Sequence, residues 1–170
     1  TVPKLQFAPK GLSAAFCWGK MMRESVEVLF AKLDAEASKP TQGTNSAAGW
    51  DLRALEDTVV CKGSSAKIRT GIAVAIPDGW EGQIRSRSSL GAKGMIMPNG
   101  VGTIDSDYRG ELMVLATWIG EGKKFTVAKG ERVAQLLFAP VPRVTIEEVS
   151  LEELGNTERG KGGFGSTGKF

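Results

Sequence analysis

Residues 99–118 read NGVGTIDSDYRGELMVLATW, a polar, glycine-containing turn followed by a short apolar segment. Asn99-Gly100 is a hairpin signal, because both residue types tolerate the positive φ of tight hairpin turns. The apolar segment at 112–118 has the length and composition of a β-strand. This unit of turn and strand predicts antiparallel β-structure in this part of the chain.

The same unit recurs along most of the sequence. Short apolar segments stand at 24–33, 50–55, 58–61, 67–76, 80–87, 112–118, 124–127, 132–138 and 144–149. Glycine, proline, aspartate and serine separate them, a rhythm typical of an all-β barrel or sandwich rather than of βαβ units. We expect brief helices only at 88–94 or near 151–154.

The two ends of the chain differ from this β domain, which we place at 23–154. Residues 1–22 show neither a helix nor a strand period and are interpreted as an N-terminal extension without a predicted fold. Residues 155–170, GNTERGKGGFGSTGKF, contain many glycines and few apolar side chains. Such a segment cannot build a core, so we expect a flexible C-terminal arm.

The composition is that of a soluble globular protein, with 41% hydrophobic residues, 24% charged residues and a net charge of +3. This balance predicts no strong attraction to nucleic acid or to a membrane, and the apolar runs are shorter than the ~18 residues of a membrane span. We therefore expect a cytoplasmic protein, or one inside the nucleus or an organelle. Cys17 and Cys61 stand far apart without a CxxC motif, so we expect free thiols and no zinc site.

Histidine is absent from the sequence. This excludes a Ser-His-Asp triad, a Cys-His pair and an imidazole metal site within the chain. Any catalysis must use carboxylates, arginine or lysine, backbone donors, or a hard cation held by oxygen ligands.

The segment 99–110 is the part of the chain richest in chemical groups. Glycines that let backbone approach a ligand precede an acidic pair, Tyr108 and Arg109. Taken alone, such a turn is more often structural than functional. Its weight comes from the motifs elsewhere in the chain.

A second motif, RSRSSLGAKG at 85–94, follows a predicted strand. Arg87, Ser88 and Ser89 offer guanidinium and hydroxyl donors that suit a phosphate chain. The serines are poor candidates for nucleophiles, because no histidine can activate them and Lys93 is not at SxxK spacing. As an isolated feature, the segment is equally well a solvated basic turn.

Two further segments place polar residues inside apolar strands. Asp51 lies within AAGWDLRA, where an aspartate needs a partner, either a cation such as Arg53 or a metal-bound water. Arg132 and Gln135 interrupt KGERVAQLLF, which is otherwise a strand with one polar face.

The arm contains partial matches to two nucleotide motifs, GxGxxG and the P-loop. Neither has its structural context, because no parallel strand precedes the glycines and the chain ends before a helix can follow. Arg159, Phe164 and the hydroxyls of Ser166 and Thr167 suit a segment that folds over an anionic aromatic ligand.

Taken in order, AAGWDL, RSRSSLG, NGVGTIDSDYRG, KGERVAQLLF and RGKGGFGSTG resemble the five motifs of the trimeric dUTPase family. The resemblance covers roughly residue 24 to the C-terminus, and the third and fifth motifs are the most specific. It implies a β-clip, jelly-roll-like distorted barrel and a homotrimer with active sites between subunits. It also implies Mg²⁺-assisted hydrolysis of dUTP to dUMP and pyrophosphate, which limits uracil in DNA and supplies dUMP for dTMP synthesis.

The resemblance also assigns roles to residues. Asp105 orients or deprotonates the water that attacks the α-phosphorus, and Asp51 holds hydrated Mg²⁺ through water. Asn99 reads the uracil edge, Tyr108 lies under the sugar where it crowds out a 2′-hydroxyl, and Phe164 stacks on the base. The other implied substrate contacts are Arg87, Ser88, Ser89, Gly102, Thr103, Ile104, Gln135, Arg159, Gly165, Ser166 and Thr167. Arg132 is expected to support the site rather than form it.

Two positions depart from the family pattern. Ser86 stands where a proline often precedes the arginine, and Trp50 where tyrosine or phenylalanine is usual. Both neighbour motif residues, so they bear on loop stiffness more than on activity. Two rival functions remain open: a dCTP deaminase, whose phosphate motif is similar, and a nucleotide-gated protein-binding module on the same fold.

Overall fold

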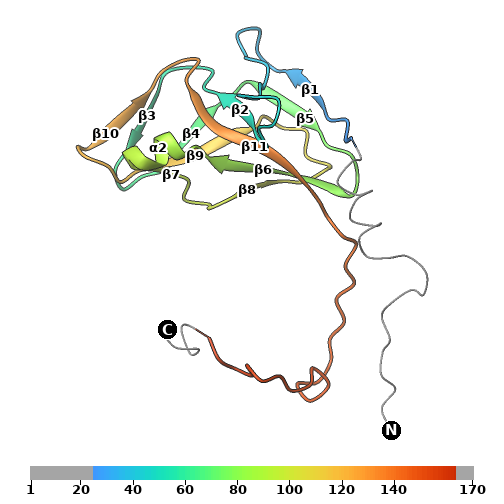
Figure 1. The fold of residues 1–170 in the computed structure, drawn as a ribbon. Coiled ribbons are helices and arrows are strands. Elements are labelled where there is room, and N and C mark those ends of the chain that lie inside the picture. The colour runs from blue at the N-terminus through green and yellow to red at the C-terminus, as the bar shows by residue number, and fades with distance from the viewer. Residues whose placement is uncertain (1–24, 164–170) are drawn as a thin grey trace.

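The computed structural model describes residues 25–163, which form an almost entirely β structure (Figure 1). The strands are antiparallel partners within four sheets. Their bounds are β1 Leu29–Lys32, β2 Trp50–Arg53, β3 Thr58–Cys61, β4 Ala66–Arg69, β5 Ile72–Ala75, β6 Trp80–Ser86, β7 Met95–Ile96, β8 Gly102–Ile104, β9 Met113–Trp118, β10 Lys124–Val127 and β11 Arg132–Pro140. The short helix α2 spans Ser88–Lys93.

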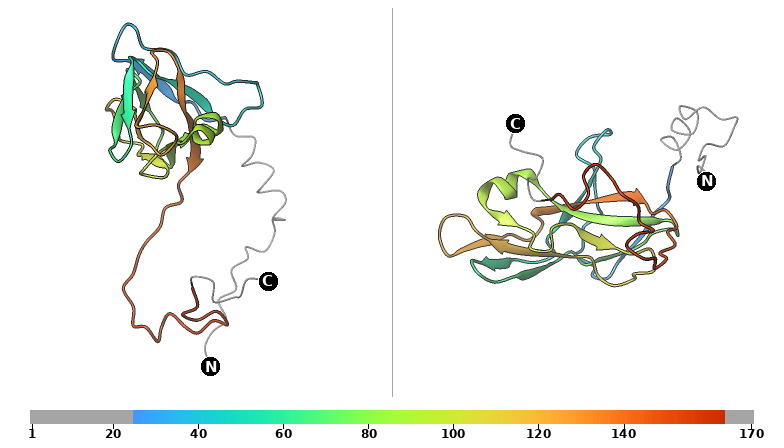
Figure 2. Two further views of the ribbon diagram at one scale, coloured as in Figure 1. Left: turned by 90° about the vertical axis from the view of Figure 1, so that its left-hand side faces the viewer. Right: turned by 90° about the horizontal axis from the view of Figure 1, so that it is seen from below.

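The sheets wrap around one apolar interior (Figures 1 and 2). The largest sheet has the order β2-β11-β6-β8, and the others are β4-β9-β7, β1-β5 and β10-β3. Alternate residues of β9 point inward, so Val114, Ala116 and Trp118 are buried while their neighbours are not. The sequence prediction of an all-β, jelly-roll-like barrel is confirmed.

One predicted strand, 67–76, is divided in the structure. It forms β4 and β5, which belong to different sheets and meet at Thr70-Gly71. Gly71 has φ +69, and a Cβ atom there would lie 2.9 Å from the Cβ of Ala37. A glycine is therefore needed at this corner, because a side chain would be strained and crowded.

The segment 141–150 forms no strand within the described residues, so the strand predicted at 144–149 is wrong. All ten residues are exposed, and Ile146 is 92% exposed. Apolar alternation alone does not make a strand when no neighbouring strand supplies backbone partners. Figure 1 shows this orange segment leaving the barrel after β11. The chain thus leaves the barrel before residue 155, where we predict that the arm begins.

The helix predicted at 88–94 is confirmed by α2, whereas residues 151–154 form only turns. Helix α2 ends at Gly94, whose φ of +104 favours glycine. The short strands β7 and β8 were not predicted. Cys61 is a free, exposed thiol, and Cys17 lies outside the described residues. Between residues 25 and 163, the structure contains no helix with the length and apolar character to cross a membrane.

Candidate active site

Asp51 is the buried centre of an ionic cluster in the largest sheet. Its side chain is 5% exposed, and Oδ2 accepts a hydrogen bond from Nη1 of Arg132 at 3.1 Å. Oδ1 lies 3.2 Å from Nε of Arg87. Two guanidinium groups around one carboxylate leave a net positive charge, which favours an anionic ligand. We call Asp51, Arg87 and Arg132 the basic cluster.

The structure gives Asp51 other partners than Arg53, the cation that the sequence suggested. A cation does pair with Asp51, but Arg53 is not that cation, because its Nη1 donates to the carbonyl of Gly130 at 2.9 Å. Arg87 also donates from Nη1 to the carbonyl of Arg132 at 3.1 Å, which ties the two arginines together. The sequence separation of these residues concealed the pairing.

Sheet register brings the basic cluster together. β11 lies between β2 and β6, and Gln135 faces Asp51 on one side and Arg85 on the other. A register shift between Arg132 and Ala134 marks a β-bulge, a feature that re-aims the side chains beside it. Arg87 follows β6 directly, and Ser88 and Ser89 are exposed at the start of α2. Motifs far apart in sequence therefore share one end of the sheet.

The segment 99–110 forms a hairpin turn and strand on the other side of this sheet. Gly100 has φ +69 and donates its N–H to the carbonyl of Met97 at 3.0 Å. Asn99 and Thr103 are exposed, while Gly102 is buried, and a Cβ on Gly102 would lie 3.3 Å from Nδ2 of Asn99. A side chain at position 102 would therefore crowd Asn99, and glycine leaves this space open.

Asp105 and Tyr108 lie in one turn after β8, which we call the Asp105 turn. The N–H of Tyr108 donates to the carbonyl of Asp105 at 3.1 Å, and both side chains are exposed. They share the lining of a cleft of about 290 Å³, together with Lys67, Thr103, Ile104, Glu111, Met113 and Leu115. Asp105 also lines a second cleft of about 380 Å³, which includes Trp80 and Arg143.

The basic cluster and this turn are far apart within one chain. On one side of the sheet, Asp51 of β2 faces Gln135 of β11, which faces Arg85 of β6. On the other side, Ile104 of β8 faces Gly82 of β6. Asp105 is therefore displaced from Asp51 by three strand spacings across the sheet and by about four residues along the strand direction. With ~4.8 Å between strands and ~3.3 Å per residue, a flat sheet of this register would separate Asp51 and Asp105 by roughly 20 Å. The chain brings Arg87, Ser88 and Gln135 to one end of the sheet but does not bring Asp105 to them.

The arm carries the remaining predicted residues. Arg159 is exposed, and its Nε donates to the carbonyl of Gly162 at 3.0 Å within the arm itself. Figure 1 shows the chain after β11 extending away from the sheets. Phe164, Gly165, Ser166 and Thr167 lie outside the described residues.

The described residues contain no group of three or more histidine, cysteine, aspartate or glutamate side chains placed to hold a metal. Oδ1 of Asp51 is buried and accepts no hydrogen bond from this part of the chain, despite its ion pair with Arg87. This oxygen keeps a lone pair that fits one water of a hydrated cation.

Glu111 and Arg69 beside the turn were missed by sequence reasoning. Nε of Arg69 donates to both carboxylate oxygens of Glu111, at 3.1 and 3.2 Å. That hydrogen bond and the negative charge of Glu111 raise the pKa of Arg69 above its ordinary value. The two residues are 42 positions apart, and nothing in the sequence indicates that they meet.

Comparison with known proteins gives one consistent result. The dUTPase family model matches residues 35–168. A deoxyuridine 5'-triphosphate nucleotidohydrolase of Nautilia profundicola is 50% identical, over 81% of this chain and 96% of the relative. The enzyme of the same name from Anaplasma marginale is 48% identical, over 76% and 88%.

Solved structures have the same fold. The dUTPase of Staphylococcus bacteriophage 80alpha with dUPNHPP has a TM-score of 0.70 at 28% identity, over 84% of this chain and 98% of that chain. A dUTPase mutant from phage phi11 of S. aureus, described with a structural Mg(II) ion, has a TM-score of 0.67 at 22% identity, over 74% and 99%. At that identity the second likeness shows the fold alone. By the match to its family model and the identity to these relatives, the chain belongs to the dUTPase family.

Proposed function

We propose that this chain hydrolyses dUTP to dUMP and pyrophosphate by attack of water on the α-phosphorus. The observation that carries the proposal is 50% identity to a deoxyuridine 5'-triphosphate nucleotidohydrolase over 96% of that relative. The two groups of residues described above supply the chemistry: the exposed Asp105 and its turn, and the basic cluster around the buried Asp51.

Asp105 is the residue that orients or deprotonates the attacking water. Its carboxylate is exposed at the turn after β8, where a water can lie between it and a phosphate. A carboxylate is suited to this task because it accepts a proton without forming a covalent intermediate. No histidine in the chain competes for the role.

The basic cluster binds the phosphates. Arg87 and Arg132 surround Asp51, and the cluster keeps one unit of excess positive charge. Arg87 stands at the edge of the cluster beside Ser88 and Ser89, so its guanidinium and their hydroxyls reach phosphate oxygens. Gln135 lies opposite Asp51 on β11 and adds a neutral donor.

Mg²⁺ belongs to the substrate complex in this proposal. When bound, it neutralises the charge of the triphosphate. Asp51 would hold it through water with Oδ1, the oxygen that accepts no hydrogen bond from the described residues. Arg87 and Arg132 keep this carboxylate oriented, so Asp51 serves the phosphate site from a fixed position.

The hairpin recognises the nucleoside. The amide of Asn99 accepts from N3–H and donates to O4 of uracil, while the backbone of Gly102, Thr103 and Ile104 completes the base edge. The ring of Tyr108 lies under the sugar and leaves no room for a 2′-hydroxyl.

The site is assembled between subunits of a homotrimer. The separation of roughly 20 Å between Asp51 and Asp105 supports this, because the three phosphates of one nucleotide span far less. A hairpin from one subunit and a basic cluster from its neighbour complete the pair. The arm closes the site, with Arg159, Gly165, Ser166 and Thr167 on the phosphates and Phe164 on the base.

One assay tests the proposal against its rivals. The full chain is incubated with Mg²⁺ and dUTP, dCTP, UTP or dTTP in turn, and pyrophosphate and ammonia are followed. The proposal expects pyrophosphate from dUTP, little from the other nucleotides, and no ammonia. Ammonia from dCTP would indicate a deaminase, and turnover of no nucleotide would indicate a binding module.

A further inference from the structure

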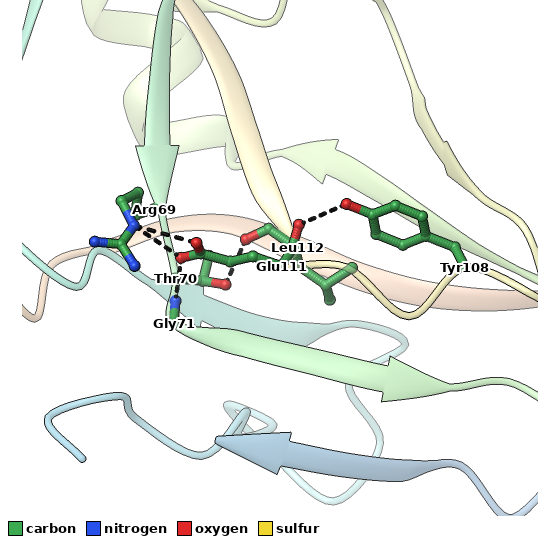
Figure 3. Close-up of polar contacts among 6 residues, drawn as sticks. All are labelled: Arg69, Thr70, Gly71, Tyr108, Glu111 and Leu112. Carbon is green, nitrogen blue, oxygen red and sulfur yellow. Dashed lines mark hydrogen bonds and ion pairs between the residues drawn. The ribbon is translucent and has the colours of Figure 1, made fainter. Parts of the chain in front are cut away.

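Glu111 links Tyr108 of the Asp105 turn to the corner between β4 and β5 (Figure 3). Its Oε1 accepts a hydrogen bond from the amide of Gly71 at 2.8 Å, and both carboxylate oxygens accept from Nε of Arg69. Its backbone carbonyl accepts a hydrogen bond from the hydroxyl of Tyr108 at 3.0 Å. Glu111 therefore bonds to the barrel through its side chain and to Tyr108 through its backbone carbonyl.

The barrel side of this link is firmly held. The hydroxyl of Thr70, which is 2% exposed, donates to the carbonyl of Leu112 at 2.5 Å. The amide of Leu112 donates to the carbonyl of Ile72 at 2.8 Å. The side chain of Glu111 is only 16% exposed, so its bonds to Arg69 and Gly71 are charge-assisted and partly shielded from water. The carbonyl of Glu111 thus has a fixed position relative to the sheets.

The ring of Tyr108, by contrast, is exposed, and the carbonyl of Glu111 is the hydrogen-bond acceptor that holds its hydroxyl. Tyr108 is 40% exposed, so few core contacts define its ring. Its ring packs over Gly110, where a Cβ would overlap the hydroxyl and lie 2.6 Å from Cζ. Gly110 leaves the space, and the carbonyl of Glu111 supplies the acceptor that keeps the ring in it.

We propose that Glu111 is a positioning residue for Tyr108 and thereby sets the preference for dUTP over UTP. This inference rests on the proposed function, in which the Tyr108 ring is the wall against a 2′-hydroxyl. A steric filter discriminates only while its wall stays in place, because a wall that can move lets the larger substrate in. Arg69 and Gly71 act one step further away, by holding the carboxylate.

Enzyme kinetics test the selectivity. We compare the ratio of kcat/KM for dUTP to kcat/KM for UTP in the unmutated chain and in Glu111→Ala, Glu111→Gln and Tyr108→Phe. Tyr108→Phe removes the hydrogen bond to the carbonyl of Glu111. Glu111→Ala keeps that carbonyl but removes the side-chain bonds to Arg69 and Gly71 that hold it in place. Each change should lower the ratio about tenfold. Glu111→Gln should recover part of the ratio, because its side-chain oxygen still accepts from Gly71. The Glu111→Ala, Tyr108→Phe double variant should lose no more than either single variant.

Glu36→Ala is the matched control. It removes a carboxylate that also pairs with a cation at 3.1 Å, Lys129, but at an exposed site outside the turn. Its ratio should equal that of the unmutated chain. A merely structural role for Glu111 would lower kcat/KM for both nucleotides together and leave the ratio unchanged.

Tyr108 can also be observed without any turnover, because it is the one tyrosine of the sequence. Tyrosine labelled with carbon-13 at Cζ gives a single line that responds to the hydrogen bond of the hydroxyl. The line should move in Glu111→Ala and stay in place in Glu36→Ala. An unmoved line with an unchanged selectivity ratio would overturn the inference, whereas absence of dUTP turnover in the unmutated chain would overturn the proposed function.

Discussion

The basic cluster and the Asp105 turn are held in place in opposite ways. The cluster lies inside the largest sheet, where Asp51 is 4% exposed and two guanidinium groups compensate its charge. The turn is exposed and is fixed by the backbone hydrogen bond from Tyr108 to Asp105 and by the bond from the Tyr108 hydroxyl to the carbonyl of Glu111. A buried ion pair is coupled to folding, whereas an exposed carboxylate is not. Mutations in the cluster should therefore affect stability and activity together, and mutations in the turn should affect activity alone.

The largest effect is expected from Asp105→Asn, which keeps the shape of the side chain and removes its charge. Turnover of dUTP should fall about 10²-fold or more if general-base catalysis has its usual weight. Binding of a non-hydrolysable dUTP analogue and the melting temperature should remain unchanged. Asp78→Asn, at an exposed neighbouring position in the second cleft, is the control. Turnover near normal in Asp105→Asn would contradict the assignment.

Removing the arm should have the next largest effect. Among the described residues the sheets end at Pro140 with β11, so a chain that stops at Leu154 should keep its fold and the proposed trimeric assembly. Its kcat should fall about tenfold or more, because water exclusion and phosphate positioning are lost together.

Phe164→Ala should give a milder form of the same defect. Light scattering and steady-state kinetics on the truncated chain separate the possibilities. Full activity would mean that the arm is idle, and loss of the trimer would mean that it is a structural strap.

Tyr108→Ala should change specificity more than rate. Without the ring, the space below the sugar can accept a 2′-hydroxyl, so the preference for dUTP over UTP should fall at least as far as in Tyr108→Phe. The measurement is the kcat/KM ratio for the two nucleotides. An equal ratio in the variant and the unmutated chain would place the filter elsewhere.

The smallest effect concerns stability, and it tests the claim that the ion pairs of the buried Asp51 are coupled to folding whereas an exposed ion pair is not. Arg132→Ala removes the donor to Oδ2 of Asp51 and should lower the free energy of unfolding by about 1–2 kcal/mol, because a buried acceptor loses its partner. Lys129→Ala removes an exposed pair with Glu36 from the same loop and strand region and should cost under about 0.5 kcal/mol. Equal losses in a denaturant titration would contradict the distinction.

Sequence patterns predicted the β domain and most of its strands, because alternating apolar residues and turn residues act locally. They failed at Gly71, where one apolar run turns a corner, and at 144–149, where the pattern lacks a partner strand. The residues of the proposed site were found through their motifs. The pairing of Asp51 with Arg87 and Arg132, and of Glu111 with Arg69, depends on register between distant strands and was not predictable.

The central claim is that the turn of one subunit works with the basic cluster of another. Mixed refolding of two variants, Asp105→Asn and Arg87→Ala, tests it most directly. Each variant alone should be nearly inactive, since every site lacks one group. In trimers mixed at equal ratio, about one quarter of the sites combine an intact Asp105 with an intact Arg87 from different chains. The account predicts that the mixture recovers about that fraction of the unmutated kcat, and activity no greater than the sum of the two separate variants would contradict it.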